Sequence, residues 1–174
     1  MNLSVATPSI SHKAEQTQAG SLERAAEIDA RVHAGVPDIG GSPYLLHSLR
    51  VMLRLQEPVA RIVAVRHDLV EDGGPAWDFE RLTREGFADT LSEALRPVTK
   101  TDEDKDQPDD SAETQIARHL AFIQRAKAHP IGRLVKLADL ENDLDTTRLP
   151  QPHSAKDELR LRRYRIAREL LLVP

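Results

Sequence analysis

The chain repeatedly places apolar residues at the three- and four-residue spacing of an amphipathic helix, and proline or glycine separates these segments. The segments with this spacing are residues 21–33, 43–55, 58–72, 78–86, 90–95, 110–128, 131–144 and 155–172. No stretch shows the alternation of apolar and polar residues that marks a half-buried strand. The sequence therefore predicts an all-α fold, with seven or eight helices in a compact bundle.

Residues of known capping type mark several of the predicted helix boundaries. Ser21 and Asp78 can accept hydrogen bonds from the free N–H groups of a first helical turn. Pro58 suits the first turn of the third helix, where a missing N–H costs nothing. Glycine and proline at residues 73–75 stop that helix, so we expect it to run from Pro58 to Asp72.

A length of 174 residues suits one domain. Residues 1–20 are polar and aperiodic, which predicts a flexible N-terminal tail ahead of a domain over residues 21–174. Pro150 and Pro152 predict a break before the last helix. Residues 102–110 are strongly acidic, and we expect them to form a solvated, mobile loop.

The composition excludes several classes of function. The chain has 28 acidic against 24 basic residues, a net charge of −4, and only one Trp, two Tyr and three Phe. This balance gives no general attraction to nucleic acid or anionic lipid, and it leaves little for base stacking. The lack of cysteine excludes disulfides, thiol nucleophiles and thiolate metal sites. Without a recognisable signal peptide or membrane span, we expect a cytoplasmic protein that binds neither nucleic acid nor membrane.

The last predicted helix is the one feature that could favour nucleic acid, because it is rich in basic residues. These are Lys156, Arg160, Arg162, Arg163, Arg165 and Arg168. The same helix also has an apolar side that includes Leu161 and Leu171. We therefore favour a solvated basic face on a helix that packs against the core.

The third helix gains four ionisable groups near its end, over residues 62–72. His67 and Glu71 are four residues apart, and so are Asp68 and Asp72, so each pair shares a helix face. The alternative is a solvated, acidic helix end. Carboxylates in a last turn oppose the helix dipole, which disfavours that alternative.

Two further positions, far away in the sequence, repeat the pattern of an ionisable group beside apolar residues. His47 lies at the edge of an apolar helix face, where a single histidine is more often a hydrogen-bonded boundary residue. Asp139 follows an apolar run and shares a face with Asp143, as the outside of an amphipathic helix would also do. With His67 and Asp68 they supply two imidazoles and two carboxylates, a set that suits Mn²⁺, Fe²⁺, Zn²⁺ or a similar ion.

Four blocks of sequence, taken in order, resemble the H…HD…D pattern of the HD-superfamily metal-dependent phosphohydrolases. The blocks are Gly40-Gly-Ser-Pro-Tyr-Leu-Leu-His47, His67-Asp-Leu-Val-Glu-Asp72, Val98-Thr-Lys100 and Val135-Lys-Leu-Ala-Asp139. They look most like the hydrolase domain of RelA/SpoT proteins and the small alarmone hydrolases. The resemblance covers about residues 21–149.

The resemblance implies an all-α enzyme that holds one divalent ion, most often Mn²⁺, with Fe²⁺, Zn²⁺, Ni²⁺ or Co²⁺ as alternatives. It implies removal of the 3′-pyrophosphate from guanosine tetra- or pentaphosphate. By position, Glu71 and Asp72 would orient and activate the attacking water, and Thr146 would lie near the substrate's phosphates. The metal ligands implied are His47, His67, Asp68 and Asp139.

The sequence departs from the family pattern at three places. Asp38, Ile39 and Gly40 stand where the family often has a basic pair and a small hydroxyl residue that hold the nucleotide. Asp143 replaces an asparagine. Arg66 replaces an apolar residue, and we expect its stem to be partly buried with its guanidinium on a carboxylate or a substrate phosphate, the alternative being an approach to water.

These departures predict weak nucleotide binding, because Asp38 adds a negative charge near a polyphosphate. Lys100, Lys136 or Arg148 could compensate. The substrate contacts that we expect from the sequence are Arg66, Lys100, Lys136, Asn142, Asp143, Thr146 and Arg148.

The hypothesis from the sequence is thus a phosphohydrolase acting on a guanine nucleotide or another phosphorylated small molecule. With no synthetase segment, the chain is expected to degrade and not to make an alarmone. One alternative is an HD phosphohydrolase for another nucleotide or phosphate ester. The other is a non-catalytic module that binds metal or nucleotide, which Asp38 and Asp143 favour.

Overall fold

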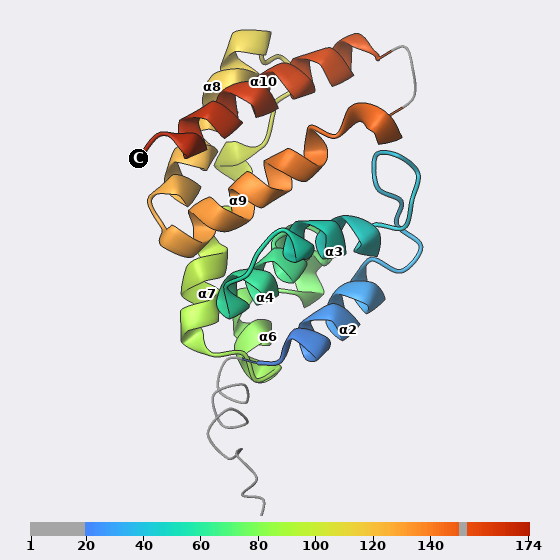
Figure 1. The fold of residues 1–174 in the computed structure, drawn as a ribbon, viewed down its shortest axis with the longest axis vertical. Helices are drawn as coiled ribbons and strands as arrows, with labels where there is room; N and C mark the ends of the chain where they lie inside the picture. The colour runs from blue at the N-terminus through green and yellow to red at the C-terminus, as the bar shows by residue number, and fades with distance from the viewer. Residues whose placement is uncertain (1–19, 150–152) are drawn as a thin grey trace, which may run out of the picture.

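The structure, a computed structural model, describes residues 20–149 and 153–174 (Figure 1). Every regular element within these ranges is a helix, and an isolated bridge joins Pro37 to Pro43. The predicted all-α fold is confirmed. The expected tail, apart from Gly20, and the expected break at Pro150 and Pro152 lie outside the described residues, so the division into tail and domain stays a prediction.

The helices agree closely with the predicted segments. In chain order they are α2 (Leu22–Val32), α3 (Leu45–Leu53), α4 (Pro58–Arg66), α5 (Leu69–Asp72), α6 (Phe79–Arg84), α7 (Asp89–Leu95), α8 (Ala112–Lys127), α9 (Pro130–Asp143) and α10 (Ala155–Leu172). Short 3-10 turns lie at Gly74–Ala76, Arg96–Val98, Asp102–Asp104 and Thr146–Arg148. Ser21 and Asp78 cap α2 and α6 as expected, each accepting from a first-turn N–H.

One helix prediction is wrong: the third helix is interrupted at His67 and Asp68. The imidazole Nδ1 of His67 lies 2.7 Å from the carbonyl oxygen of Ala64. That carbonyl is the acceptor that the N–H of Asp68 would use in a continuous α-helix. The side chain of His67 therefore competes with the helix at this point, and the chain begins again as α5.

Helix α4 is the centre of the larger core, and most of its residues are buried. It packs against α2, α3, α7 and α9. A second, smaller core forms where α8, α9 and α10 meet around Phe122 and Leu140. Figure 1 shows α9 between these two groups of helices. Side chains of α9 therefore contact both groups of helices, and the candidate site includes residues of this helix.

The acidic loop is held to its neighbours by ion pairs. Asp104 lies 2.6 Å from Arg125 of α8, and Asp106 lies 2.7 Å from Arg163 of α10. The apolar side expected for α10 is present, with Leu161 buried. None of the described helices combines the length and hydropathy needed to span a bilayer.

Candidate metal centre

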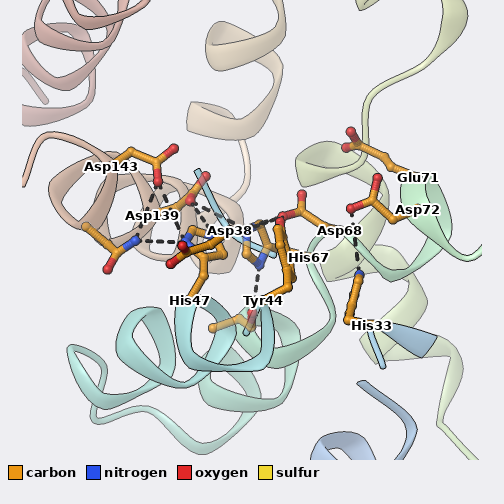
Figure 2. Close-up of polar contacts among 12 residues, drawn as sticks. His33, Asp38, Tyr44, His47, His67, Asp68, Glu71, Asp72, Asp139 and Asp143 are labelled. Carbon is orange, nitrogen blue, oxygen red and sulfur yellow. Dashed lines mark hydrogen bonds and ion pairs between the residues drawn. The ribbon is translucent and has the colours of Figure 1, made fainter. Parts of the chain in front are cut away.

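Three buried side chains from different helices converge between α3, α4 and α9 (Figure 2). His47 comes from α3, His67 from the end of α4 and Asp139 from α9. The two Nε2 atoms are 3.3 Å apart, and Asp139 Oδ1 lies 3.4 Å from the first and 3.5 Å from the second. Their ligand atoms all lie within 4.8 Å of one another. Such a cluster could hold a metal ion.

The hydrogen bond of His67 prepares its ring for a metal. Its Nδ1 donates to the Ala64 carbonyl, so in the neutral ring Nε2 carries the lone pair that faces the cluster. Burial by itself lowers the pKa of His67, but the charges of Asp68 and Asp139 outweigh burial and raise it. Two carboxylates thus favour a positive charge at this position.

His47 has a different environment on its Nδ1 side. Arg50 donates to the Asn142 Oδ1 atom at 3.0 Å, which turns the Asn142 Nδ2 toward His47 Nδ1 at 2.7 Å. Asp143 Oδ1 lies 3.6 Å from the same nitrogen. A metal ion on Nε2 requires the ring proton to lie on Nδ1, facing Asp143, and Asn142 must then present its oxygen to the ring.

Asp68 lies beside the cluster, with its Oδ2 3.0 Å from His67 Nε2 and 3.9 Å from His47 Nε2. The Tyr44 hydroxyl donates to the same oxygen. Burial raises the pKa of Asp68, and the charge and hydrogen bond of His67 outweigh burial, so its pKa is lowered. The structure therefore brings all four predicted ligands together, and the ligand role of Asp68 stays a prediction.

Lys136 balances part of the negative charge. Its Nζ lies 2.5 Å from Asp139 Oδ2, one turn along α9, and both side chains are buried. One oxygen of Asp139 thus faces the imidazoles while the other is paired. Burial lowers the pKa of Lys136, but the charge of Asp139 outweighs it and raises the pKa.

The predicted catalytic pair, Glu71 and Asp72, is split between two different contacts (Figure 2). Glu71 accepts from the backbone N–H of Lys100 at 2.5 Å and faces its Nζ at 3.3 Å. Asp72 turns the other way, with its Oδ2 3.7 Å from His33 Nε2. Both residues line the pocket described next, and their catalytic role stays a prediction.

The cluster opens into a pocket of about 270 Å³. Four cations line it: Lys100, Lys136, Arg148 and Arg160. Sequence reasoning missed five lining residues: Tyr44, His119, Leu140, Arg160 and Tyr164. For the two residues of α10, the one indication in the sequence was that Arg160 and Tyr164 are four positions apart and so share a helix face.

The buried Nε2 of His119, on another wall of the pocket, has no hydrogen-bond partner among the described residues. Burial, with the nearby Lys136 and Arg163 charges, lowers its pKa to about 3. Its ring contacts Tyr164 at 5.4 Å between centroids. This wall of the pocket is therefore neutral and partly aromatic.

The expected substrate contacts fall into two groups. Lys100, Lys136, Asp143 and Arg148 line the pocket, whereas Arg66, Asn142 and Thr146 do not. The prediction that Arg66 contacts the substrate or the neighbours of Asp139 is wrong, whereas the expected burial of its stem is confirmed. Its side chain is fully buried on the ring of Phe87, 3.6 Å from the centroid, and reaches neither the pocket nor the neighbours of Asp139. The reason is that α4 turns this residue toward α2.

Asp38 is not the free negative charge that the sequence suggested. Its Oδ2 accepts from Arg50 at 2.7 Å and from Arg148 at 2.9 Å. Its Oδ1 accepts from two N–H groups of its own loop, at Gly40 and Ser42. Burial raises the pKa of Asp38, but these hydrogen bonds outweigh it and lower the pKa. The repulsion between Asp38 and a phosphate is therefore largely offset. Part of the positive charge of Arg148 compensates Asp38 and is not available to a substrate.

Comparison with known proteins gives one informative similarity. No family model matches the chain. A Streptomyces coelicolor protein described as GTP pyrophosphokinase is 31% identical over 140 residues. The matched part is 78% of this chain but only 16% of that protein. The chain thus spans about a sixth of its relative, and the activity of the whole relative does not transfer with the match.

Proposed function

We propose that the protein is a metal-dependent phosphohydrolase of nucleotides, and most specifically a 3′-pyrophosphohydrolase of guanosine tetra- and pentaphosphate. The observation that carries the proposal is the buried cluster of His47, His67 and Asp139 at a pocket lined with cations. The resemblance of the surrounding sequence to HD-superfamily hydrolases supplies the reaction class.

The charges of the site support a divalent cation as part of the machinery. Asp139 is a buried carboxylate and Asp68 a partly buried one, and Lys136 offsets the charge of Asp139. When His67 is neutral, as a metal ligand must be, a net negative charge remains beside the imidazoles, and a divalent cation would offset it. A nitrogen and oxygen donor set of this kind fits Mn²⁺ and similar ions, and we propose Mn²⁺.

The proposed roles of the chain's own residues follow from their positions. A bound divalent ion would lower the pKa of water and neutralise phosphate charge. Glu71 is held by Lys100 at the pocket wall, and Asp72 has an exposed carboxylate there, so both could orient a water and accept its proton. The water oxygen bonds to the phosphorus next to the 3′-oxygen, that P–O bond breaks, and the 3′-oxygen takes up a proton. Pyrophosphate and GDP or GTP are the products.

The GTP pyrophosphokinase supports a guanine nucleotide and pyrophosphate chemistry for this site. Its name describes transfer of pyrophosphate and not hydrolysis, which makes such a transfer the second candidate function. The match covers only 16% of that protein, so we rank hydrolysis first.

The deciding experiment incubates the purified chain with guanosine tetraphosphate and Mn²⁺, and measures GDP and pyrophosphate. A parallel reaction with GTP and ATP, analysed for a pyrophosphorylated product, tests the second candidate. We expect hydrolysis, no synthesis, and complete loss of activity in the chelator-treated protein and in Asp139→Asn. Glu141→Gln, on the same helix beside Arg168, is the matched control and should remain active.

Other outcomes identify the alternatives. Release of phosphate or pyrophosphate from a different nucleotide in a panel would replace the alarmone as substrate. Metal bound by the chain with no turnover of any phosphate ester would establish a non-catalytic binding module and overturn the proposal.

A further inference from the structure

Behind the pocket lies a second group of buried ionisable side chains that the proposed chemistry does not use. Asp29 and His33 are one turn apart on α2, and each side chain is only 1% exposed. His33 Nδ1 lies 2.9 Å from Asp29 Oδ1, an ion-pair distance, although the orientation of the two groups does not form a hydrogen bond within the described structure. The other ring nitrogen faces Asp72, which is half-exposed at the pocket wall. His33 therefore connects a buried carboxylate to a candidate catalytic one.

Arg66 supplies the positive charge next to Asp29. The guanidinium is completely buried and makes no hydrogen bond within the described structure. Burial lowers the pKa of Arg66 to about 10, while the charges of Asp29 and Glu85 act in the opposite direction. A buried guanidinium needs a nearby negative charge. The charge of Arg66 thus acts on Asp29, which lies near the C-terminal end of α2.

The geometry around His33 favours a ring that carries both protons. Nδ1 faces Asp29, so a neutral ring with its proton on Nδ1 would present a lone pair to the Asp72 carboxylate. The ring is stacked on Tyr44, with centroids 4.5 Å apart at 30°, which limits its rotation. The ionisable groups that face it are Asp29 on its own helix, Asp72 on α5 and Tyr44 before α3, with Arg66 of α4 beyond Asp29.

We propose that Asp29 and His33 form a buried relay that holds Asp72 in place: Asp29 orients and charges the imidazole, and the imidazolium Nε2–H binds the Asp72 carboxylate. The Nε2 to Oδ2 distance of 3.7 Å exceeds a hydrogen bond, and a small movement of the exposed Asp72 side chain brings it to roughly 3 Å. His33 is then a positioning residue, because it acts through Asp72. The catalytic consequence rests on the proposed function, whereas the charge state of His33 does not.

The electrostatics agree with this arrangement. Burial alone would lower the pKa of His33, but the neighbouring carboxylates, Asp29 first and then Asp72, outweigh burial and raise the pKa to about 9. The relay therefore keeps its charge through neutral pH and loses it in alkali.

The first test measures the charge of His33 without any need for activity. Imidazole ¹⁵N shifts of the full chain are followed against pH, and the His33 signals are identified by their loss in His33→Gln. We expect a midpoint well above the ordinary value of about 6.5, lowered by Asp29→Asn and by Asp72→Asn. Glu27→Gln, which removes an exposed charge from the same helix, should leave the midpoint unchanged.

A midpoint near the ordinary value, or one that Asp29→Asn and Asp72→Asn leave in place, overturns the relay. Should the buried Asp29→Asn variant fail to fold, Asp72→Asn decides the question, because its side chain is half-exposed.

The second test links the relay to turnover. His33→Gln should lower kcat by roughly 10- to 100-fold, the usual cost of losing a supporting hydrogen bond at such a site, with KM and metal content unchanged. Unchanged kcat, or loss of the metal, contradicts the positioning role. If the wild-type chain hydrolyses no nucleotide, the proposed function fails while the titration still decides whether the relay exists.

Discussion

Two neighbouring groups of ionisable residues both contact Tyr44, and they differ in how their charges are balanced. At the candidate metal centre, His67 must be neutral to bind a metal, and the carboxylates of Asp68 and Asp139 would then face Lys136 as the remaining cation of the described group, which opens into the pocket. Behind it, Asp29 faces Arg66 and His33, and only Asp72 reaches the pocket. With its imidazoles neutral, the first group has an excess of negative charge that a divalent ion can offset, whereas in the second group a charged His33 and Arg66 balance the carboxylates.

The difference shows how burial of similar residue types can serve different purposes. Ionised groups taken out of water need compensation, and a protein can provide it with its own side chains or with a bound ion. The converging imidazole nitrogens of His47 and His67 indicate compensation by a bound ion. If the two groups are independent, substitutions in the first should change metal content and turnover, and substitutions in the second should change stability without loss of metal.

The largest effect is expected at the metal centre itself. Asp68→Asn keeps the shape of the side chain and removes the charge that would offset a divalent cation. We expect loss of bound metal and of all measurable activity, with elemental analysis as the measurement. Chelation of the wild type should have the same effect, and added Mn²⁺ should reverse it. A variant with full metal content would show that Asp68 is not a ligand.

Glu71→Gln should separate metal binding from turnover. The amide cannot accept a proton, so kcat should fall by roughly 10²-fold or more, while metal content stays close to that of the wild type. Pyrophosphate release and elemental analysis on the same preparation measure both quantities. Full activity in this variant would remove Glu71 from the mechanism.

Arg66→Leu should act on stability and not on the metal centre. It leaves Asp29 buried with less compensating charge, although the two side chains form no direct ion pair, and an uncompensated buried charge costs up to about 3–5 kcal/mol of unfolding free energy. Metal content and KM should not change, because the side chain lies on Phe87 and away from the pocket. Denaturant unfolding measures the effect, and unchanged stability would mean that Asp29 does not depend on Arg66.

Arg148→Ala should test how Asp38 is compensated. Without Arg148, Asp38 keeps Arg50 but presents more negative charge to the pocket. We expect KM for guanosine tetraphosphate to rise by roughly 10-fold, in line with the loss of a charged hydrogen bond, with kcat nearly unchanged. An equal KM in variant and wild type would show that neither residue affects nucleotide binding.

The smallest effect is a pH dependence of stability that originates in the second group. Because folding raises the pKa of His33 from 6.5 to about 9, its contribution is fully present below about pH 6.5 and is lost as pH rises through about 9. The stability difference between wild type and His33→Gln should therefore be larger at about pH 6 than at about pH 10. A difference that is constant with pH would assign His33 a purely steric role.

Much of the fold could be predicted because its signals are local. The period of apolar residues and the capping residues Ser21 and Asp78 depend on neighbours three or four positions away, and the structure keeps these contacts. The interruption at His67 could not be predicted in this way. It arises from a side chain that competes for the Ala64 carbonyl, which no periodicity reports.

For the site, the sequence by itself determined which residue types were present and, through the resemblance, that His47, His67, Asp68 and Asp139 belong together. Only the tertiary structure decided that Arg66 turns toward α2, that Asp38 is neutralised by Arg50 and Arg148, and that His33 faces Asp72. The physical reason is that helical periodicity states which residues share one face of a helix. Which faces meet, and so which charges compensate one another, depends on how separate helices pack across α4 and α9.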